Sequence, residues 1–214
     1  MKTLGKFAAL LTIATTLVFI SACGGNPAGA GVNAANAGKP FEEKKIEGNE
    51  LKFSNDGSTL NFTAAKVSLT HKGGFKKFSG TVTTDKDGKE VVGISAEIEM
   101  DSVWTDDPAK TNEKLTNHLK TADFFDVPKF PKANFVATSI TKDGDKYKVD
   151  GNFTLHGEKK GITFPANISV KDGEVTAKAK FKINRREFNI NYPGAPNDLI
   201  SDEVVIELDI KAKK

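Results

Sequence analysis

The strongest constraint on the fold of this 214-residue chain is an alternation of apolar and polar side chains that recurs from about Phe41 onward. In one clear example, Tyr147, Val149 and Phe153 alternate with charged or polar residues. Successive side chains of a β-strand point to opposite faces, so the pattern predicts strands with one apolar and one solvated face. The same period recurs in residues 92–100, 162–170, 175–183 and 204–211.

Short turn sequences separate these segments. Asp87-Gly88, Asp143-Gly144 and Asp172-Gly173 are typical of tight β-hairpins, and Lys160-Gly161 indicates a looser turn. Sequential hairpins place neighbouring strands antiparallel. Further apolar runs lie at residues 51–53, 60–70, 75–83 and 134–140. We therefore predict an all-β fold, an antiparallel barrel of about eight strands, because closure hides one face and leaves no free edge; a two-sheet sandwich is the alternative.

One segment departs from this alternation. Between Asp107 and Asp126, apolar residues recur at helical spacing and share a face with His118, which predicts a short helix. The apolar members of this face are Leu115, Leu119 and Ala122. The connection that follows is rich in phenylalanine, with Phe124, Phe125, Phe130 and Phe135. So much apolar surface is expected to fold over one end of the barrel.

The amino terminus resembles a targeting signal. Lys2 and Lys6 precede a run of 14 uncharged residues, 7–20, which is short of the roughly 20 residues that span a membrane. The run ends in Ile20-Ser21-Ala22-Cys23, which resembles the bacterial lipoprotein processing motif. We therefore expect residues 1–22 to be removed and Cys23 to be lipidated. The alternative is an ordinary secretory signal followed by an incidental cysteine.

The signal divides the chain into three expected parts. After the signal, residues 23–40 are rich in Gly, Ala and Asn and are expected to form a flexible tether behind the lipidated Cys23. Residues 41–214 are expected to form the barrel domain. Cys23 is the single cysteine, which excludes an internal disulfide framework.

Charge and residue chemistry argue against two classes of function. The net charge of +3 falls to +1 without the signal, and the basic residues are interspersed with acidic ones, so no nucleic-acid partner is expected. Of the three histidines, His156 lies on the polar face of its strand and is expected to be solvated. A metal site built from His71 and His118 is the alternative to a non-enzyme, but it would need further ligands. We predict no catalytic residue, no metal and no cofactor.

The inward rows combine large and small apolar side chains. Phenylalanines share these rows with Ala96, Gly151, Ala166, Ala177 and Ala179. An eight-stranded barrel is either filled by its side chains or just wide enough for one small ligand. Small inward residues leave room for an apolar ligand, although the pattern alone is equally consistent with a packed core.

Several stretches resemble the YceI-like family. They are residues 71–80 (HKGGFKKFSG), 118–127 (HLKTADFFDV), 129–135, 151–157, 164–165, 183–188 and 200–204. The resemblance implies a lipocalin-like, eight-stranded antiparallel barrel in the bacterial periplasm. It also implies a non-catalytic protein that binds polyprenoids or other long-chain amphiphiles. The segment between His71 and Phe78 is shorter than in many members, and a lipoprotein signal is not typical of every member.

Together these features predict a membrane-tethered protein that binds, sequesters or carries a long-chain isoprenoid, quinone or fatty-acid-like ligand. The candidate ligand-binding residues are Phe62, His71, Leu115, His118, Leu119, Phe124, Phe125, Phe130, Phe135, Phe153, Phe164, Ala179, Phe181 and Arg185. His118, Lys120 and Arg185 are candidates to contact a polar or anionic head group.

The expected location is the periplasmic face of the bacterial cell envelope. An anchor in the outer membrane is preferred over one in the inner membrane, and a homodimer is left open. The rival interpretation is a structural or stress-related lipoprotein whose barrel is filled by its own side chains.

Overall fold

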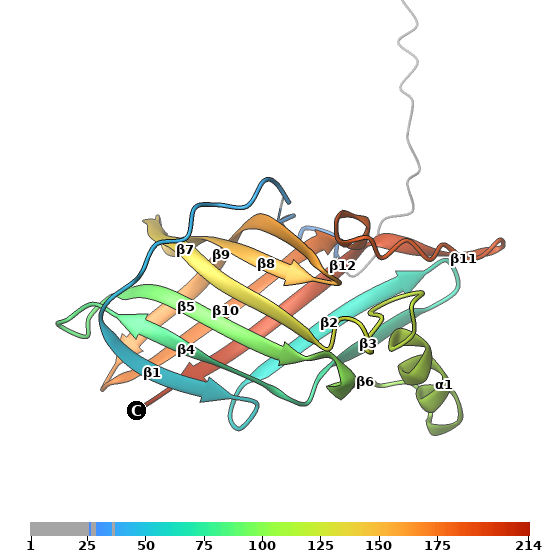
Figure 1. Cartoon of the computed structure of the whole chain (residues 1–214), viewed down its shortest axis with the longest axis horizontal. Coiled ribbons are helices and arrows are strands. Elements are labelled where there is room, and N and C mark those ends of the chain that lie inside the picture. Colours follow the sequence, from blue (N-terminus) through green and yellow to red (C-terminus); the bar gives the residue numbers. More distant parts are fainter. Residues whose placement is uncertain (1–25, 27–28, 36) are drawn as a thin grey trace, which may run out of the picture.

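The computed structural model describes residues 26, 29–35 and 37–214, which form an antiparallel β-barrel with one α-helix at one end (Figure 1). The strands are β1 (Asn49–Ser54), β2 (Thr59–Lys66), β3 (Thr70–Phe75), β4 (Phe78–Thr84), β5 (Val91–Glu99), β6 (Val103–Thr105), β7 (Lys132–Asp143), β8 (Lys146–Leu155), β9 (Glu158–Lys171), β10 (Glu174–Asn184), β11 (Gly194–Ala195) and β12 (Asp198–Ala212). The helix α1 is Ala109–Leu119, and the 3-10 turns η2 and η3 are Met100–Ser102 and Arg185–Phe188. Within this described part, no helix is long and apolar enough to cross a membrane.

The all-β antiparallel architecture is confirmed, although the described residues form twelve strands instead of eight. Three long runs of extended chain are each divided in two. The first run is β1 and β2, the second is β3 and β4, and the third is β5 and β6. β4 pairs with β1 on one side and β5 on the other, and β3 pairs with β2 on one side and β6 on the other. The turn at residues 55–58, the step at Lys76-Lys77 and η2 make the three divisions. The remaining extra strand, β11, is a two-residue pairing on β12.

The sheet closes on itself. Consecutive long runs pair with one another, and β12 returns to pair with β2, for example at Ile206 and Phe62. Near the far end of β12, Lys52 and Lys213 exchange two backbone hydrogen bonds, at 2.8 and 3.0 Å. Because the strands form one continuous sheet, the sandwich alternative does not apply.

Three of the four predicted turns are confirmed. Asp87-Gly88 and Asp172-Gly173 lie between consecutive antiparallel strands, and Asp143 ends β7, with Gly144 in the turn that leads to β8. The prediction at Lys160-Gly161 was wrong, because both residues lie inside β9. The turn between β8 and β9 is His156-Gly157, where both residues have positive φ, 51° and 79°, as in the hairpin turn that matches strand twist.

The helical segment is shorter than predicted. α1 ends at Leu119, and the next residues form turns in which Phe125 N donates to Leu119 O at 3.0 Å and Val127 N donates to Lys120 O at 3.0 Å. These turns bring Leu119 and Phe124 into the core, 8% and 9% exposed. Figure 1 shows α1 at the barrel end that also carries β3 and β6.

The segment predicted to be a flexible tether is instead hydrogen-bonded to the barrel at several of its described residues. Ala35 N donates to Lys182 O at 2.8 Å, and Lys182 N donates to Asn33 O at 3.0 Å. Further along, Gly38 and Gly161 exchange backbone hydrogen bonds at 2.8 and 3.2 Å. The segment therefore lies against both β9 and β10. Residues 1–22 and Cys23, with the predicted signal and lipidation site, lie outside the described residues.

The reason for this docking is a gap in the sheet. β9 and β10 pair only as far as Ala166 and Ala179, beyond which the two strands diverge. Their unpaired backbone groups on the facing edges need partners, and Asn33, Ala35 and Gly38 supply some of them. Composition alone predicted a tether because the segment has few large apolar side chains, whereas its attachment depends on backbone hydrogen bonds.

Candidate functional site: an apolar cavity in the barrel

The interior of the barrel contains a cavity of about 210 Å³. Every residue that lines it is apolar except Lys178 and Arg185. The Lys178 ammonium pairs with Asp209 at 2.8 Å, and 61% of the Lys178 side chain is exposed, so its charge lies on the outer surface. An apolar lining of this kind favours an apolar ligand.

Partly exposed inward residues show that the barrel is hollow. On β12, one face of the strand lines the cavity, yet its side chains are only half-buried: Val204, Ile206, Leu208 and Ile210. Val205, on the opposite face, is only 2% exposed because the N-terminal segment covers it, with Gly29 close by. The inward side chains therefore border unfilled space, since protein cores are normally close-packed.

Stacked rings form part of the cavity wall. Phe164 of β9 and Phe181 of β10 stack with ring centroids 4.2 Å apart and ring planes at 16°. Phe135 of β7 packs against Phe164 at 5.7 Å. Such ring pairs contribute about 0.5–1.5 kcal/mol beyond their buried area, so they fix a rigid wall beside the small side chains Ala166 and Ala179.

Glycines opposite phenylalanines determine where the space lies. The ring of Phe135 lies so close to Gly151 that a β-carbon there would overlap it. The prediction that Gly151 is one of the small residues that leave room for a ligand was wrong, because the Phe135 ring fills that room. Phe62 covers Gly73 in the same way. Alanines, in contrast, do border the cavity: Ala96, Ala166, Ala177 and Ala179.

The α1 end of the cavity is closed by aromatic and aliphatic side chains. Leu119, Phe124 and Phe125 line the cavity from α1 and the turns that follow it. Phe125 packs against Phe75 of β3, with ring centroids 6.0 Å apart. Tyr192, which precedes β11, packs against Phe124 at 5.4 Å. This arrangement places the helical segment across one end of the barrel, as the sequence predicts.

Most of the predicted ligand-binding residues border this cavity. Those that line it are Phe62, Leu119, Phe124, Phe125, Phe135, Phe153, Phe164, Ala179, Phe181 and Arg185. Four do not line it: His71, Leu115, His118 and Phe130. Leu115 packs against the core from outside, and the ring of Phe130 lies on His156 at 4.8 Å. A binding role for the lining residues stays a prediction.

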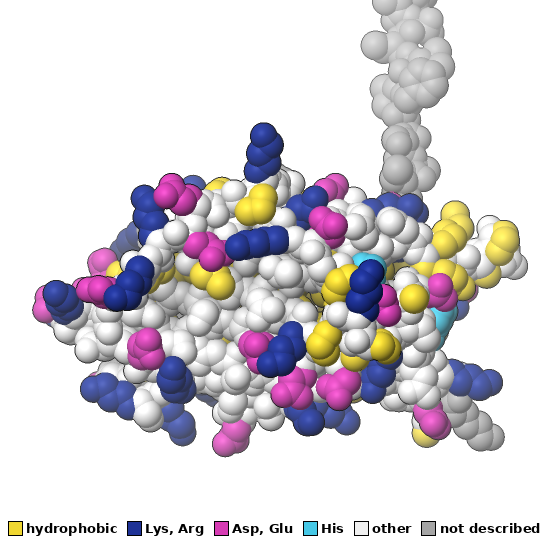
Figure 2. All heavy atoms as spheres, in the orientation of Figure 1, with side chains coloured by type: hydrophobic (Ala, Val, Ile, Leu, Met, Phe, Trp, Pro, Cys, Tyr) yellow, Lys and Arg dark blue, Asp and Glu magenta, His cyan; other side chains and the backbone are white. Residues whose placement is uncertain are grey.

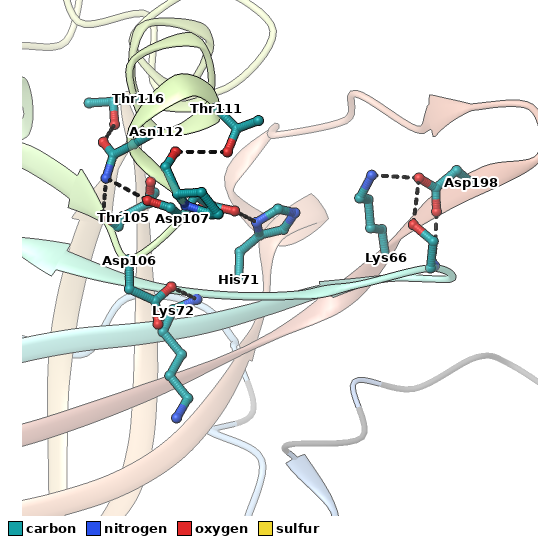
Figure 3. Close-up of polar contacts among 12 residues, drawn as sticks. Lys66, His71, Lys72, Thr105, Asp106, Asp107, Thr111, Asn112, Thr116 and Asp198 are labelled. Atoms are coloured by element: carbon teal, nitrogen blue, oxygen red, sulfur yellow. Dashed lines mark hydrogen bonds and ion pairs between the residues drawn. The ribbon is translucent and has the colours of Figure 1, made fainter.

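The three histidines have separate structural partners. Nδ1 of His71 lies 2.8 Å from Oδ1 of Asp107, a contact that joins β3 to the start of α1 (Figure 3). Nε2 of His118 lies 2.7 Å from Asp123. His156, expected to be solvated, is half-buried against Phe130. Across the described ranges, no group of three or more His, Cys, Asp or Glu side chains could hold a metal ion.

The guanidinium of Arg185 is hydrogen-bonded to protein groups and does not offer its charge to the cavity. Its buried guanidinium donates to Ser201 O at 3.0 Å and to Ile190 O at 2.6 Å. It also donates to Ile200 O and to the Asp202 carboxylate, so four of its five N–H donors are used. Burial lowers the pKa of Arg185, and the nearby Asp202 opposes that shift. The predicted head-group contact does not fit this arrangement, and Lys120 does not line the cavity.

Several residues that line the cavity were not predicted from the sequence. Phe53, Phe75 and Phe78 lie on the divided strands β1, β3 and β4, whose short alternating runs carry a weak signal. Ile190 and Ile200 flank the irregular segment around β11, and Arg185 holds both backbones in place. No local pattern marks that segment, because its position depends on a buried guanidinium.

A closed antiparallel barrel with an apolar interior cavity and one helical end defines a class of small all-β proteins. The YceI-like domain matches residues 51–212, and the chain belongs to that family. It is 30% identical over 171 residues to protein YceI of Salmonella newport (strain SL254), which covers 76% of this chain and 85% of that protein.

Two solved structures are similar in fold. Burkholderia cenocepacia BcnA superposes with a TM-score of 0.64 at 23% identity, covering 75% of this chain and 99% of BcnA. A polyisoprenoid-binding domain from Saccharophagus degradans, implicated in plant cell wall breakdown, superposes with a TM-score of 0.62 at 15% identity. That match covers 78% of this chain and 99% of the domain.

Proposed function

We propose that this protein binds the apolar chain of an amphiphile in its barrel and does so without catalysis. The observation that carries the proposal is the cavity whose inward side chains on β12, Val204 to Ile210, are half-buried although they face the barrel interior. An unfilled apolar cavity lowers the stability of the folded protein, because the residues that line it lose packing partners. An apolar ligand would restore those contacts.

The shape of the lining favours a long, narrow ligand. Lining residues extend from Leu119 at the α1 end to Ile168 and Ile210 toward the opposite end. An isoprenoid, quinone tail or fatty acyl chain meets this requirement, and the polyisoprenoid-binding domain of similar fold supports the isoprenoid class. A polar head would lie outside the cavity, because no free charged group projects into it from the described residues.

We also propose that the protein is held at the periplasmic face of a bacterial membrane, most simply the outer membrane, by acyl groups on Cys23. The support is the lipoprotein processing motif that ends in this single cysteine. More than one acyl chain is needed for stable anchoring, and this motif supplies several. Replacing Cys23 with Ser should abolish incorporation of labelled fatty acid, and persistent labelling would contradict the motif.

Native mass spectrometry tests ligand binding directly. The protein, extracted mildly from its membrane, should carry a hydrophobic molecule that denaturing extraction releases and that lipid analysis can identify. A ligand-free mass in every preparation, together with no uptake of added isoprenoid alcohols, quinones or fatty acids, would instead support a structural barrel.

A further inference from the structure

We infer that the loop end of the barrel next to β11 inserts into the bilayer that carries the anchor. The inserted surface is the apolar tip, which we define as Val67, Leu69 and Leu199. This inference rests on the proposed anchor at Cys23 and deepens the proposed function, because it gives the barrel a fixed orientation on the membrane.

The apolar tip is the most exposed aliphatic surface of the described chain. Val67 is 77% exposed, Leu69 is 50% exposed and Leu199 is 52% exposed. The two loops are adjacent, because Val67 N donates to Leu199 O at 3.1 Å. Figure 2 shows apolar side chains gathered at the end of the molecule that carries β11. Clustered exposed apolar side chains mark an interaction surface more often than scattered ones do.

The polar groups beneath the apolar tip bind to one another. Lys66 Nζ lies 2.6 Å from Oδ2 of Asp198, and the Ser68 hydroxyl donates to the same oxygen at 2.9 Å. Ser68 N donates to Oδ1 of Asp198 at 3.0 Å. Lys66 and Leu69 also share backbone hydrogen bonds across the turn. Because these groups are already paired, moving the tip into a less polar environment leaves few of them without partners.

The length of chain before the described residues places the anchor close to this end. The side-chain amide of Asn26 donates to Thr63 O at 2.8 Å and to Glu203 O at 3.4 Å, on the outer wall formed by β2 and β12. Cys23 precedes Asn26 by three residues, a reach of at most about 11 Å. Thr63 precedes Val67 by four residues, or roughly 13 Å of extended strand. The anchor and the apolar tip therefore approach the same region of membrane.

A bilayer fits both observations better than a second protein. The acyl groups at Cys23 bring lipid to within a few residues of the barrel wall, so the tip meets lipid at a high local concentration. Aliphatic side chains beside a lysine are suited to the boundary between head groups and acyl chains. Insertion would also turn the α1 end of the cavity toward the source of long-chain ligands, because α1 lies at the same end of the barrel as β11 (Figure 1).

The experiment uses the lipidated protein, in which acylation occupies the only native thiol. An environment-sensitive fluorophore on Leu199→Cys is compared with the same label on Asp87→Cys, an exposed position in the β4–β5 turn at the opposite end (Figure 1). Both proteins are reconstituted in vesicles of phosphatidylethanolamine and phosphatidylglycerol, some of which carry a quencher on the acyl chains. The label at 199 should shift to shorter wavelength and be quenched strongly, while the label at 87 should remain water-like.

A second pair of variants separates insertion from simple proximity. Adding Val67→Asp and Leu69→Asp to the labelled Leu199→Cys protein should remove the wavelength shift and the quenching. Adding Val136→Asp, an exposed residue on the barrel wall, should leave both unchanged. Equal, water-like signals at positions 199 and 87 in acylated protein would overturn the insertion while leaving the anchor intact. A mass without acyl groups would overturn the anchor and the insertion together, whereas native mass spectrometry tests cavity binding independently of both.

Discussion

The rings of Phe164 and Phe181 stack with their centroids 4.2 Å apart, joining β9 to β10 just beyond the point where their backbone pairing ends. The last backbone pair is Ala166 with Ala179. Both alanines line the cavity, so the stack and the two small side chains together set its width at this level. Enlarging one of the alanines therefore tests whether the space is used.

Replacing Ala179 with Phe should remove the ligand while the protein still folds. The new ring would occupy space that a ligand fills in the native protein, so native mass spectrometry should show loss of the hydrophobic mass. Lys180→Phe is the matched control, because residue 180 is exposed on the opposite face of β10. If the barrel is filled instead, Ala179→Phe should lower the free energy of unfolding by about 1–3 kcal/mol through overpacking. That loss, with no change in any bound ligand, would contradict the hollow barrel.

A second prediction concerns Gly151, whose missing side chain accommodates the Phe135 ring. A β-carbon there would overlap the ring and would also lie 2.7 Å from Val136 O. Gly151→Ala should therefore lower the free energy of unfolding by about 1–3 kcal/mol. Combining it with Phe135→Leu should cost less than the sum of the two single changes, because the smaller side chain can move aside. Additive costs in denaturant titrations would show that the ring and the glycine are independent.

Alternation predicted the barrel well because it follows from local geometry. An apolar row such as Val175 to Ile183 must face one side of its strand, and hairpins such as Asp172-Gly173 then fix the neighbouring strand. The divisions within the long strands were missed, because a kink like η2 interrupts the row without an obvious turn sequence. Lys160-Gly161 was mistaken for a turn for a similar reason. Gly161 lies inside β9, and its missing side chain allows Lys39 and Phe41 to approach the strand from outside.

The candidate site was only partly predictable for a different reason. Phenylalanines on inward rows line the cavity as expected, because their strand positions determine their direction. Arg185 also borders it, but its donors are used by carbonyl groups of residues distant in sequence, and no local pattern reveals such partners. The histidines showed the same limit, since His71 and His118 each pair with an aspartate that spacing did not single out.

Acid should loosen the contact between the two loops of the apolar tip. The hydrogen bond from Lys66, followed by those from Ser68, holds the pKa of Asp198 below its ordinary value of 3.8. Because the folded-state pKa is depressed, the ionised Asp198 carboxylate stabilises the folded contact at pH values above 3.8. This stabilisation is lost as the pH falls through the lower folded-state pKa. The protection factor of the Ser68 amide, which compares its exchange rate with the intrinsic rate at the same pH, should therefore fall as the pH drops below 3.8. Asp198→Asn should lower that protection factor at neutral pH and remove its dependence on acid; an unchanged acid response of the protection factor in this variant would contradict the assignment.

The last prediction separates folding from ligand retention at the helical end of the barrel. Leu119 is 8% exposed, whereas Phe125 is half-buried and lines the cavity beside Phe75. Leu119→Ala should lower the free energy of unfolding by about 2–5 kcal/mol, as truncation of a buried leucine does. Phe125→Ala should cost less stability and lose more of the co-purified ligand, because part of its surface faces the ligand instead of the core.

Hydrogen exchange over residues 112–126, with and without ligand, measures the coupling directly. If this segment closes over a bound chain, its amides should exchange more slowly in the loaded protein, because ligand contacts raise the free energy of local opening. Amides in the β4–β5 hairpin, at the opposite end of the barrel, provide the internal control and should respond less. Equal protection of residues 112–126 in the two states would show that the segment belongs to the fold alone. In that case the ligand would be retained by the barrel wall, and Phe125→Ala would leave its occupancy unchanged.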